Sequence, residues 1–275
     1  MTHQQLIAWG RNELLDVDNN SLNILFEHSF GVPFYKAILF PEEEPCSEKI
    51  DFFKQNVTRR VSGEPVQYIV GHWPFAGFDF FAEPEVLIPR DDTMVLLETA
   101  RPFLTKDSIL IDMCTGSGIL GISLSLLTGC TAICADISPA ALNLTQKNIG
   151  HLNATNATAQ KSDVLNPSVA NEFPMADVIV SNPPYIKTGV LASLQPEVQK
   201  EPVLALDGGT SGLVFYEALL QNLLPALKNN GWLLVEIGYD QGAEVTALFE
   251  QAGLQNIQIH NDLSGLNRVV QGQII

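Results

Sequence analysis

Strand-like and helix-like segments alternate along the second half of the chain, and this alternation restricts the possible folds more than any other feature. Strands separated by helices form a parallel sheet with helices on both faces. Ser138 and Pro139 have the residue types that cap and open a helix. The apolar runs are residues 108–114, 131–137, 157–165, 176–182 and 232–238, and the helical patterns between them are residues 119–127, 139–150 and 212–228. We therefore expect an α/β, Rossmann-like fold.

The last two strand-like segments depart from this pattern. Residues 256–262 and 267–274 both read as strands, and only a short turn separates them. Such a short connection joins antiparallel strands, because parallel strands need a long crossover. The sequence thus predicts a mostly parallel sheet with an antiparallel C-terminal strand. Pro225 predicts a kink in the helix expected before residue 228.

The N-terminal part has a different character. Helical patterns cover residues 3–15 and 21–30, and Ser47 is of a type that caps a third helix, which Gly63 would end. Aromatic and β-branched residues between Pro65 and Pro89 instead predict a β-hairpin. We therefore expect three parts: a small helical domain at residues 1–62, a β-hairpin linker at residues 63–89, and an α/β domain at residues 90–275.

The charge of the chain bears on its partners. It carries 31 acidic and 15 basic residues, for a formal net charge of −16. Such a charge repels a phosphate backbone unless a local basic patch overcomes it. The densest basic pair is Arg59 and Arg60. We therefore expect no direct binding to nucleic acid.

The sequence also bears on location. Its start lacks a secretory pattern, which predicts a cytoplasmic protein. The uncharged stretch Met113–Ala135 contains glycine, serine and threonine and a break at Gly129, so a buried strand, helix and strand fit it better than a membrane span. No membrane association is expected.

Cysteine and histidine give no metal-binding pattern. The five histidines are scattered singly, and the cysteines lack the paired spacing of a zinc site. We expect all four cysteines to be reduced, buried thiols: Cys46, Cys114, Cys130 and Cys134.

A glycine-rich loop marks a nucleotide-like ligand site. Gly116–Gly121 reads G-x-G-x-x-G between a strand and a helix, and Asp136 closes the next strand, where a carboxylate can bind ribose hydroxyls. A dehydrogenase that binds a nicotinamide dinucleotide is therefore a serious alternative for this chain. Asp112, just before the loop, disfavours a pyrophosphate and favours the cationic cofactor S-adenosylmethionine, unless it only caps loop amides. Asp163 and Val164 end the third strand, within reach of an adenine edge.

The segment Ser181–Gly189, "SNPPYIKTG", follows the fourth strand. Its prolines cannot donate ladder hydrogen bonds, so they stop the strand and stiffen the chain. The Asn182 side-chain oxygen and the Pro183 carbonyl can together accept both hydrogens of an NH2 group, and Tyr185 offers a flat face for stacking. The segment predicts a site for a planar nitrogen, either an amide or an exocyclic base amine, although a simple turn is the alternative.

Six motifs in fixed order extend this interpretation. They are "GEPVQYIVG", "VLIPRDDT", "DMCTGSG", "SNPPYI", "EPVLALDGG" and "RVVQG". With them the chain resembles the HemK-type protein-(glutamine N5) methyltransferases from about Gly63 to Gln271, close to the members that act on peptide-chain release factors. The resemblance implies a class I fold dependent on S-adenosylmethionine, a helical N-terminal domain, and methylation of the glutamine in a Gly-Gly-Gln tripeptide.

The resemblance also assigns roles to individual residues. Asp136 would bind the cofactor ribose, and Asp163 with Val164 the adenine end. The glutamine amide would be held by Asn182, Pro183, Pro184 and Tyr185. The cofactor loop would consist of Cys114, Thr115, Gly116, Ser117 and Gly118.

Three positions depart from the family pattern. Cys114 stands where the loop often has glycine, Met94 where glutamate is frequent, and Ser211 where aspartate is usual. None of them belongs to the expected amide site. These differences therefore bear on how precisely the ligands are positioned and not on the expected activity.

Three alternatives remain at this point. An adenine-N6 methyltransferase of nucleic acid would use the same loop, but it would need a basic groove. A glutamine methyltransferase of a ribosomal protein is the nearest alternative, and a non-catalytic cofactor-binding scaffold is the most distant. Because the cofactor motifs all follow Arg90, we expect the helical domain to recognise the protein substrate.

Overall fold

The structure is a computed structural model that describes residues 1–15, 17 and 19–275, apart from the side chain of Asn19. The chain forms two compact units. One contains residues 1–72 together with 195–200, and the other contains residues 73–194 together with 201–275. The first unit therefore includes ten residues beyond position 62 and a short segment from much later in the chain.

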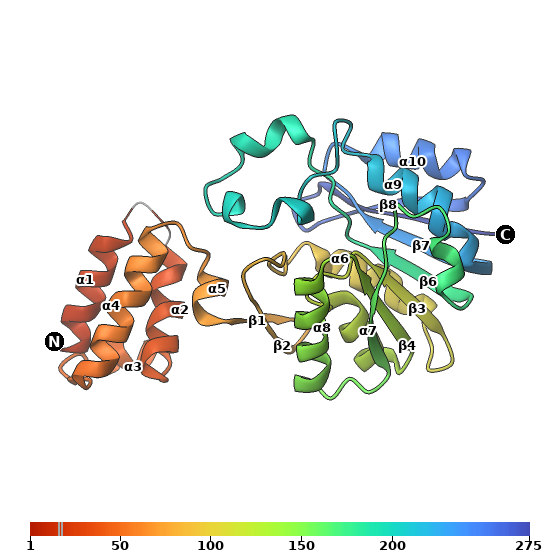
Figure 1. Ribbon diagram of the computed structural model, residues 1–275. Coiled ribbons are helices and arrows are strands. Elements are labelled where there is room, and N and C mark those ends of the chain that lie inside the picture. The colour runs from red at the N-terminus through yellow and green to blue at the C-terminus, as the bar shows by residue number, and fades with distance from the viewer. Residues whose placement is uncertain (16, 18) are drawn as a thin grey trace. The chain divides into compact units, whose positions relative to one another are not determined.

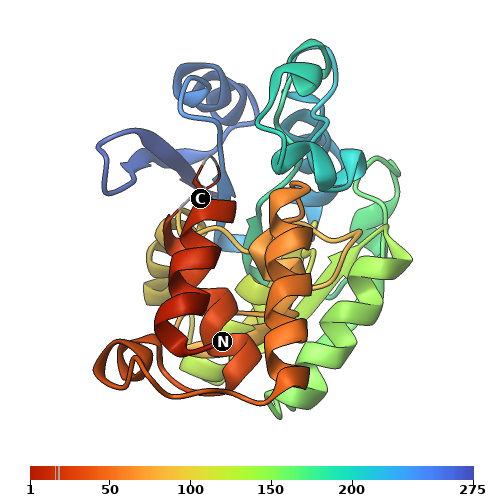
Figure 2. The ribbon, with the colours of Figure 1, turned by 90° about the vertical axis from the view of Figure 1, so that its left-hand side faces the viewer.

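The first unit is helical (Figures 1 and 2). A capping box opens its first helix, because Thr2 accepts from the Gln5 amide and the Gln5 side chain accepts from the Thr2 amide. Phe26 and Phe53 are fully buried in its core, with ring centroids 5.7 Å apart. The helices are α1 (His3–Glu13), α2 (Asn19–Phe30), α3 (Phe34–Leu39), α4 (Ser47–Val61) and α5 (Val66–Val70).

Two expectations for this region were wrong. The N-cap of α4 is Cys46, with no side-chain hydrogen bond, and Ser47 is already the first helical residue. Cys46 is also exposed and Cys114 is only half-buried, whereas Cys130 and Cys134 are buried as expected.

The expected hairpin is shorter than the pattern suggested. It consists of β1 (His72–Phe75) and β2 (Phe78–Phe81). The preceding β-branched segment forms the helix α5, which Pro65 precedes in an extended conformation and Gly71 ends at a φ of +79°. A proline before the first turn and a left-handed glycine after the last favour a helix over a strand here.

A seven-stranded sheet forms the centre of the second unit. Its order is β5-β4-β3-β6-β7-β9-β8, and all pairs are parallel except those of β9 with β7 and β8. The mostly parallel sheet with an antiparallel C-terminal strand is thus confirmed. The strands are β3 (Ile109–Met113), β4 (Thr131–Asp136), β5 (Ala157–Lys161), β6 (Ala176–Ser181), β7 (Leu227–Glu236), β8 (Gln255–Asn261) and β9 (Asn267–Gln273).

The sheet changes direction between β3 and β6. The chain builds outward from β3 through β4 to β5, and then returns to place β6 on the other side of β3. At such a switch point the loops that leave the carboxyl ends of two neighbouring strands diverge, which opens a crevice for a ligand. The topology therefore predicts a site beyond the ends of β3 and β6.

Helices cover both faces of the sheet (Figure 1). Alternate residues of β3 enter different cores: Leu110 joins one apolar cluster with residues of α6 and α7, and Ile111 joins another with residues of α9 and α10. The helices are α6 (Thr93–Ala100), α7 (Ile119–Thr128), α8 (Pro139–His151), α9 (Val214–Ala218) and α10 (Gly242–Gln251).

The long helix expected at residues 212–228 is broken into short pieces. α9 ends at Ala218, a π-helical turn covers Leu219–Leu223, and a 3-10 turn covers Leu224–Ala226. Pro225 lies in that last turn, where it removes a helical hydrogen bond. As a result β7 begins at Leu227, five residues earlier than the apolar run suggested.

The uncharged stretch Met113–Ala135 runs from the end of β3 through α7 into β4. Across the described part of the chain, no helix combines the length and apolarity that a membrane crossing requires.

Candidate active site

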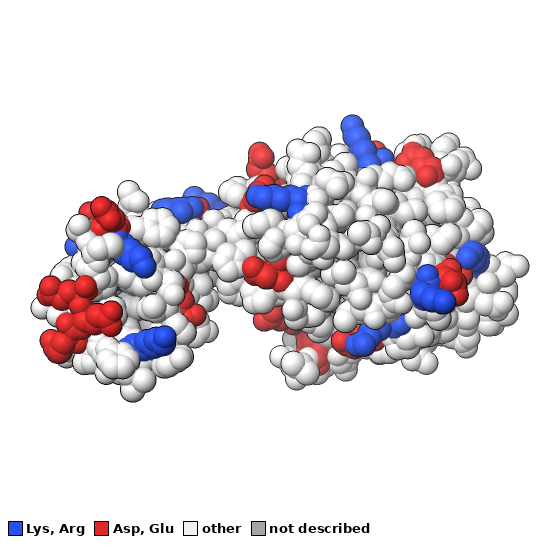
Figure 3. All heavy atoms as spheres, turned by 90° about the horizontal axis from the view of Figure 1, so that it is seen from below, with Lys and Arg blue, Asp and Glu red and all other residues white. Residues whose placement is uncertain are grey.

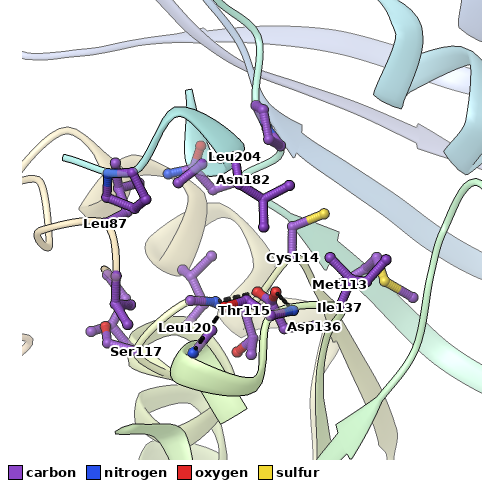
Figure 4. Close-up of a pocket in the computed structure, with 18 of the residues that line it drawn as sticks. Leu87, Met113, Cys114, Thr115, Ser117, Leu120, Asp136, Ile137, Asn182 and Leu204 are labelled. Atoms are coloured by element: carbon purple, nitrogen blue, oxygen red, sulfur yellow. Dashed lines mark hydrogen bonds between the residues drawn. The ribbon is translucent and has the colours of Figure 1, made fainter. Parts of the chain in front are cut away.

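A cavity lies at the switch point of the sheet, and residues that follow four neighbouring strands line it. They include Cys114 after β3, Asp136 at the end of β4, Asp163 after β5 and Asn182 after β6. Its empty volume is about 960 Å³, counting the part open to solvent. In Figure 4, Asn182 lies on one side of this cavity and Asp136 on the other. The predicted cofactor and acceptor residues therefore face a common space.

The glycine loop forms one wall of the cavity. Cys114, Thr115, Gly116 and Ser117 line it. Gly116 and Gly118 have φ angles of +58° and +85°, and Cys114 has φ of +60°. A residue with a side chain rarely adopts this left-handed region, so the glycine that the resemblance leads us to expect at position 114 would fit this backbone with less strain than cysteine. The loop places its backbone close to the cavity.

Asp136 joins the glycine loop to the helix that follows β4. Its Oδ2 accepts from the Gly116 amide at 3.0 Å and its Oδ1 from the Ser138 amide at 2.9 Å. Burial raises the pKa of this carboxyl group, and the backbone donors oppose that shift. Each carboxylate oxygen keeps a second lone pair, so Asp136 can still accept from a diol.

Asp163 and Val164 also line the cavity. The Asp163 Oδ1 accepts from the Leu165 amide at 2.9 Å, which is the local turn expected of an aspartate at a strand end. Val164 is buried, and its carbonyl accepts from Asn222 Nδ2 at 2.9 Å. These bonds fix the backbone at the end of the cavity opposite the switch point.

Asp112 does not line the cavity, so its expected contact with the cofactor is corrected. It is fully buried, and its Oδ2 accepts from the Thr115 hydroxyl at 2.5 Å and from the Gly121 amide at 2.9 Å. Burial raises its pKa to about 7. Asp112 therefore anchors the loop to α7 from behind, which was the alternative role.

The segment after β6 contributes only part of its residues to the cavity. Asn182 and Pro184 line it, whereas Pro183 and Tyr185 are not among the lining residues. Tyr185 packs against the apolar cluster that includes α9 and α10, and its hydroxyl lies 3.5 Å from Glu236 Oε1. Stacking of a substrate on Tyr185 stays a prediction, as does the role of the Pro183 carbonyl.

The orientation of the Asn182 amide is defined by a neighbour. Its Nδ2 donates to the Thr93 hydroxyl oxygen at 3.2 Å. Within the described residues, no donor of the chain reaches the Asn182 Oδ1 with a hydrogen bond. Asn182, which lines the cavity, therefore keeps an acceptor oxygen that no donor of the described residues uses.

A second segment, residues 206–209 within "EPVLALDGG", holds this loop in place. The Ile186 amide donates to the Leu206 carbonyl at 3.0 Å, and the Gly208 amide donates to the Ile186 carbonyl at 2.8 Å. Gln241 Nε2 donates to the Tyr185 carbonyl at 3.1 Å. The proline-rich loop is thus bonded on both sides, which limits its movement.

Several cavity residues were not predicted individually. Leu87, Arg90 and Leu204 all line the cavity. Glu201, almost fully buried, accepts from the Ile88 amide at 3.0 Å and forms an ion pair with Arg90. In the sequence these residues were marked only by the motifs "VLIPRDDT" and "EPVLALDGG". Local patterns do not reveal that the two motifs lie side by side in the fold.

Charge and metal-binding groups add little to the site. On the face in Figure 3, basic side chains form small separate groups rather than a continuous area. Arg60, half of the densest basic pair, is buried, donates to Ser21 and pairs with Glu197. Across the residues described by the structure, no cluster of three histidine, cysteine or acidic side chains could hold a metal ion.

Comparisons with known proteins agree with this geometry. The PrmC N-terminal domain matches residues 5–71, and the family described as Ribosomal protein L11 methyltransferase (PrmA) matches residues 91–248. A methyltransferase structure from Pyrococcus furiosus has a TM-score of 0.53 and 16% identity over 72% of this chain and 89% of its own. That likeness shows the fold of the second unit.

Curated relatives cover nearly the whole chain. A release factor glutamine methyltransferase of Geobacter sulfurreducens is 38% identical over 99% of this chain and 97% of its own. The protein of the same name from Bacillus subtilis is 32% identical over 97% and 96%. Since these relatives match nearly the whole chain whereas the L11 methyltransferase family matches only residues 91–248, the chain belongs to the release factor glutamine methyltransferase family.

Proposed function

We propose that this protein transfers a methyl group from S-adenosylmethionine to the side-chain amide nitrogen of the glutamine in the Gly-Gly-Gln tripeptide of peptide-chain release factors. The observation that carries the proposal is the orientation of Asn182. Asn182 lines the cavity and its Nδ2 donates to Thr93, so its side-chain oxygen would serve as the acceptor for a substrate. An acceptor at this point suits a substrate nitrogen that carries hydrogens.

The cavity fits the cofactor by the chemistry of its walls. Asp136 offers carboxylate oxygens for ribose hydroxyls, and Gly116 and Ser117 bring backbone close to the ligand, whereas the predicted loop residue Gly118 does not line the cavity. Asp163 and Val164 would hold the adenine end. When bound, S-adenosylmethionine supplies an electrophilic methyl group on a sulfonium sulfur.

The chain's own contribution is positioning and charge stabilisation. A primary amide nitrogen is a poor nucleophile because its lone pair is delocalised into the carbonyl. The Asn182 oxygen and the Pro183 carbonyl would accept both amide hydrogens, which stabilises positive charge growing on the nitrogen. Rigid alignment can lower the barrier by up to roughly 7 to 11 kcal/mol, so the prolines and the bonded segment 206–209 matter more than a strong base.

The helical unit would recognise the protein substrate. All cavity residues belong to the second unit, which leaves the first unit without a part in cofactor binding. A chain that starts at Trp73 should retain affinity for S-adenosylmethionine but lose methylation of an intact release factor. Full activity of that truncated chain on the intact protein would contradict this assignment.

The test of the function is a labelling experiment. Tritiated S-adenosylmethionine is incubated with the protein and, separately, a release factor, ribosomal protein L11, a ribosomal protein pool, and DNA or RNA. We expect label on the release factor, and mass spectrometry should place one methyl group on the glutamine side chain. Label on nucleic acid or only on a ribosomal protein would refute the proposed substrate.

Asn182→Ala supplies the matched control. It removes the acceptor but leaves the glycine loop, so affinity for the cofactor should change little. The rate should fall by about two to three orders of magnitude, the usual effect of losing one preorganised charge-stabilising group. A variant as active as the parent would show that the loop is only a turn.

A further inference from the structure

S-adenosylmethionine carries an anionic group as well as its cations, and the cavity has to accommodate both. The sulfonium and the ammonium are positive, whereas the carboxylate of the methionine moiety is negative. A carboxylate that leaves water without a partner loses much of its solvation free energy, so it needs a cation or several donors. Asp136 and Asp163, placed for the ribose and the adenine, are acidic themselves and cannot serve it.

The glycine loop is a poor place for this carboxylate, because three of its backbone amides are already used inside the fold. The Thr115 amide donates to the Ala135 carbonyl at 3.1 Å, and the Gly118 amide donates to the Thr115 carbonyl at 3.0 Å. The Gly116 amide donates to Asp136 Oδ2 at 3.0 Å. An anion site made of backbone needs several free, convergent amides, which this loop does not offer.

Arg90 is the only basic residue among the described residues that line the cavity. The other ionisable side chains there that carry charge are carboxylates, from Glu85, Asp136 and Asp163. Most of the remaining wall is apolar, with residues such as Leu87 and Leu204. An anion that enters this cavity therefore has a single cation to meet.

The fold places Arg90 at the Asn182 end of the cavity. The Thr93 amide donates to the Arg90 carbonyl at 3.1 Å, and Asn182 Nδ2 donates to the Thr93 hydroxyl oxygen at 3.2 Å. The strand order β5-β4-β3-β6 sets Asp163 and Asn182 at opposite ends of this row. With adenine at Asp163 and ribose at Asp136, the methionine moiety extends toward Asn182 on the other side of the cavity (Figure 4). Arg90 lies where that moiety ends.

Glu201 orients the Arg90 guanidinium and leaves donors free. It is almost fully buried, and it pairs with Arg90 through one oxygen while the other accepts from the Ile88 amide at 3.0 Å. A guanidinium has five N–H donors. Among the residues that the structure describes, Glu201 is the only hydrogen-bond partner of that group. The Arg90 side chain is also 38% exposed, so part of it is open to a ligand.

We propose that Arg90, oriented by Glu201, binds the carboxylate of the methionine moiety of S-adenosylmethionine. The donors that Glu201 leaves free supply charge-assisted hydrogen bonds to that anion, and a pre-oriented planar group loses little entropy on binding. The assignment deepens the proposed function and rests on its cofactor, not on the identity of the methyl acceptor. It implies that the protein rejects an otherwise identical ligand without the carboxylate.

Calorimetric titration with two ligands tests this implication. S-adenosylmethionine and its decarboxylated form share the adenosine, the sulfonium and the ammonium, and no methyl acceptor is present, so binding is read without turnover. The acidic wall alone would favour the decarboxylated ligand, which carries one more net positive charge. We expect the opposite preference, by roughly ten- to thirtyfold, between the effects of an exposed and a buried ion pair. Equal affinities would overturn the proposal.

Arg90→Gln separates ligand binding from a structural role. It should weaken S-adenosylmethionine by roughly the same ten- to thirtyfold and leave the affinity for the decarboxylated ligand nearly unchanged. An equal loss for both ligands would show a merely structural residue and overturn the proposal. Arg101→Gln is the matched control, because it removes the same charge from a half-exposed arginine that does not line the cavity. Both ligands should bind it as they bind the parent.

The test does not depend on one variant. Arg90→Gln leaves Glu201 buried without its cation, so thermal unfolding is recorded, and adding Glu201→Gln removes that lone charge if the single variant does not fold. The parent comparison needs no variant at all. No binding of S-adenosylmethionine to the parent would refute the proposed cofactor and this assignment together. Methylation of a different acceptor would refute only the proposed substrate, and the preference between the two ligands would still decide the role of Arg90.

Discussion

Gly208→Ala should damage the active site, although Gly208 is not itself among the residues that line the cavity. A Cβ built at Gly208 would lie 2.8 Å from both the carbonyl carbon and the Cα of Tyr185, and 2.9 Å from the Pro184 oxygen. All three are backbone atoms, so no flexible side chain can move aside. Ordinary contact begins near 3.4 Å, and the loop must therefore shift by about half an ångström.

The expected magnitude follows from this overlap. Inserting a methyl group into a tightly packed site costs about 1 to 3 kcal/mol of stability. A shift of about 1 Å in a reacting group can cost roughly a hundredfold in rate, so a shift half as large should lower kcat by about tenfold or somewhat more. Affinity for S-adenosylmethionine should change little, since the glycine loop is not displaced.

Initial rates by mass spectrometry, thermal unfolding and calorimetric titration of the cofactor together test this prediction. Gly189→Ala is the matched control, because Gly189 follows the same loop but a Cβ there meets nothing within 4 Å and its φ is not positive. It should behave as the parent. Parent-like activity of Gly208→Ala, or an equal loss in Gly189→Ala, would refute the steric reasoning.

Three further predictions concern the cofactor side and stability. Asp136→Ala should weaken S-adenosylmethionine binding by about 1.5 to 3 kcal/mol, the loss of a charged acceptor, and an unchanged dissociation constant would place the ribose elsewhere. Gly121→Ala should lower the free energy of unfolding by about 1 to 3 kcal/mol, because its Cβ would lie 2.5 Å from Cys134 Sγ and 3.1 Å from Asp112; denaturant titration checks this. Burial raises the pKa of Glu236 from its ordinary 4.5 in the unfolded chain to about 7 in the folded protein. The folded state therefore binds the proton more tightly, and this contribution to stability is lost as pH rises from about 4.5 through 7. Glu236→Gln should flatten that decline in unfolding curves, and an unaltered slope would contradict the assigned pKa.

The position of the site was predictable because it depends on strand ends. An apolar run marks each central strand, and the carboxyl ends of parallel strands meet at one edge of a sheet. Asp136, Asp163 and Asn182 each follow or end such a run, so their convergence required only the correct order of strands. The structure places all three at one cavity.

Contacts between distant segments could not be predicted in this way. The pairing of Arg90 with Glu201 joins residues 111 positions apart, and nothing in the local sequence of either encodes the other. The same holds for Thr93 and Asn182, which are 89 positions apart. Arg90, Thr93 and Glu201 looked like ordinary helix-start or loop residues, and only the packed sheet brings them to their partners.

The different roles of Asp112 and Asp136 follow from their positions along neighbouring strands: Asp112 pairs with Cys134, so Asp136 lies two residues farther toward the carboxyl end of the sheet. Asp136 is the last residue of β4 and turns toward the cavity, whereas Asp112 is the residue before the end of β3 and shares the sheet face of Leu110. That face is covered by α7, so the Asp112 side chain meets the Gly121 amide instead of a ligand. A buried carboxyl with a pKa of about 7 is also only partly charged at neutral pH, so it repels a pyrophosphate weakly. Discrimination against a dinucleotide therefore cannot depend on Asp112, and S-adenosylmethionine is favoured instead by the Asn182 acceptor across the cavity and by the family of the chain.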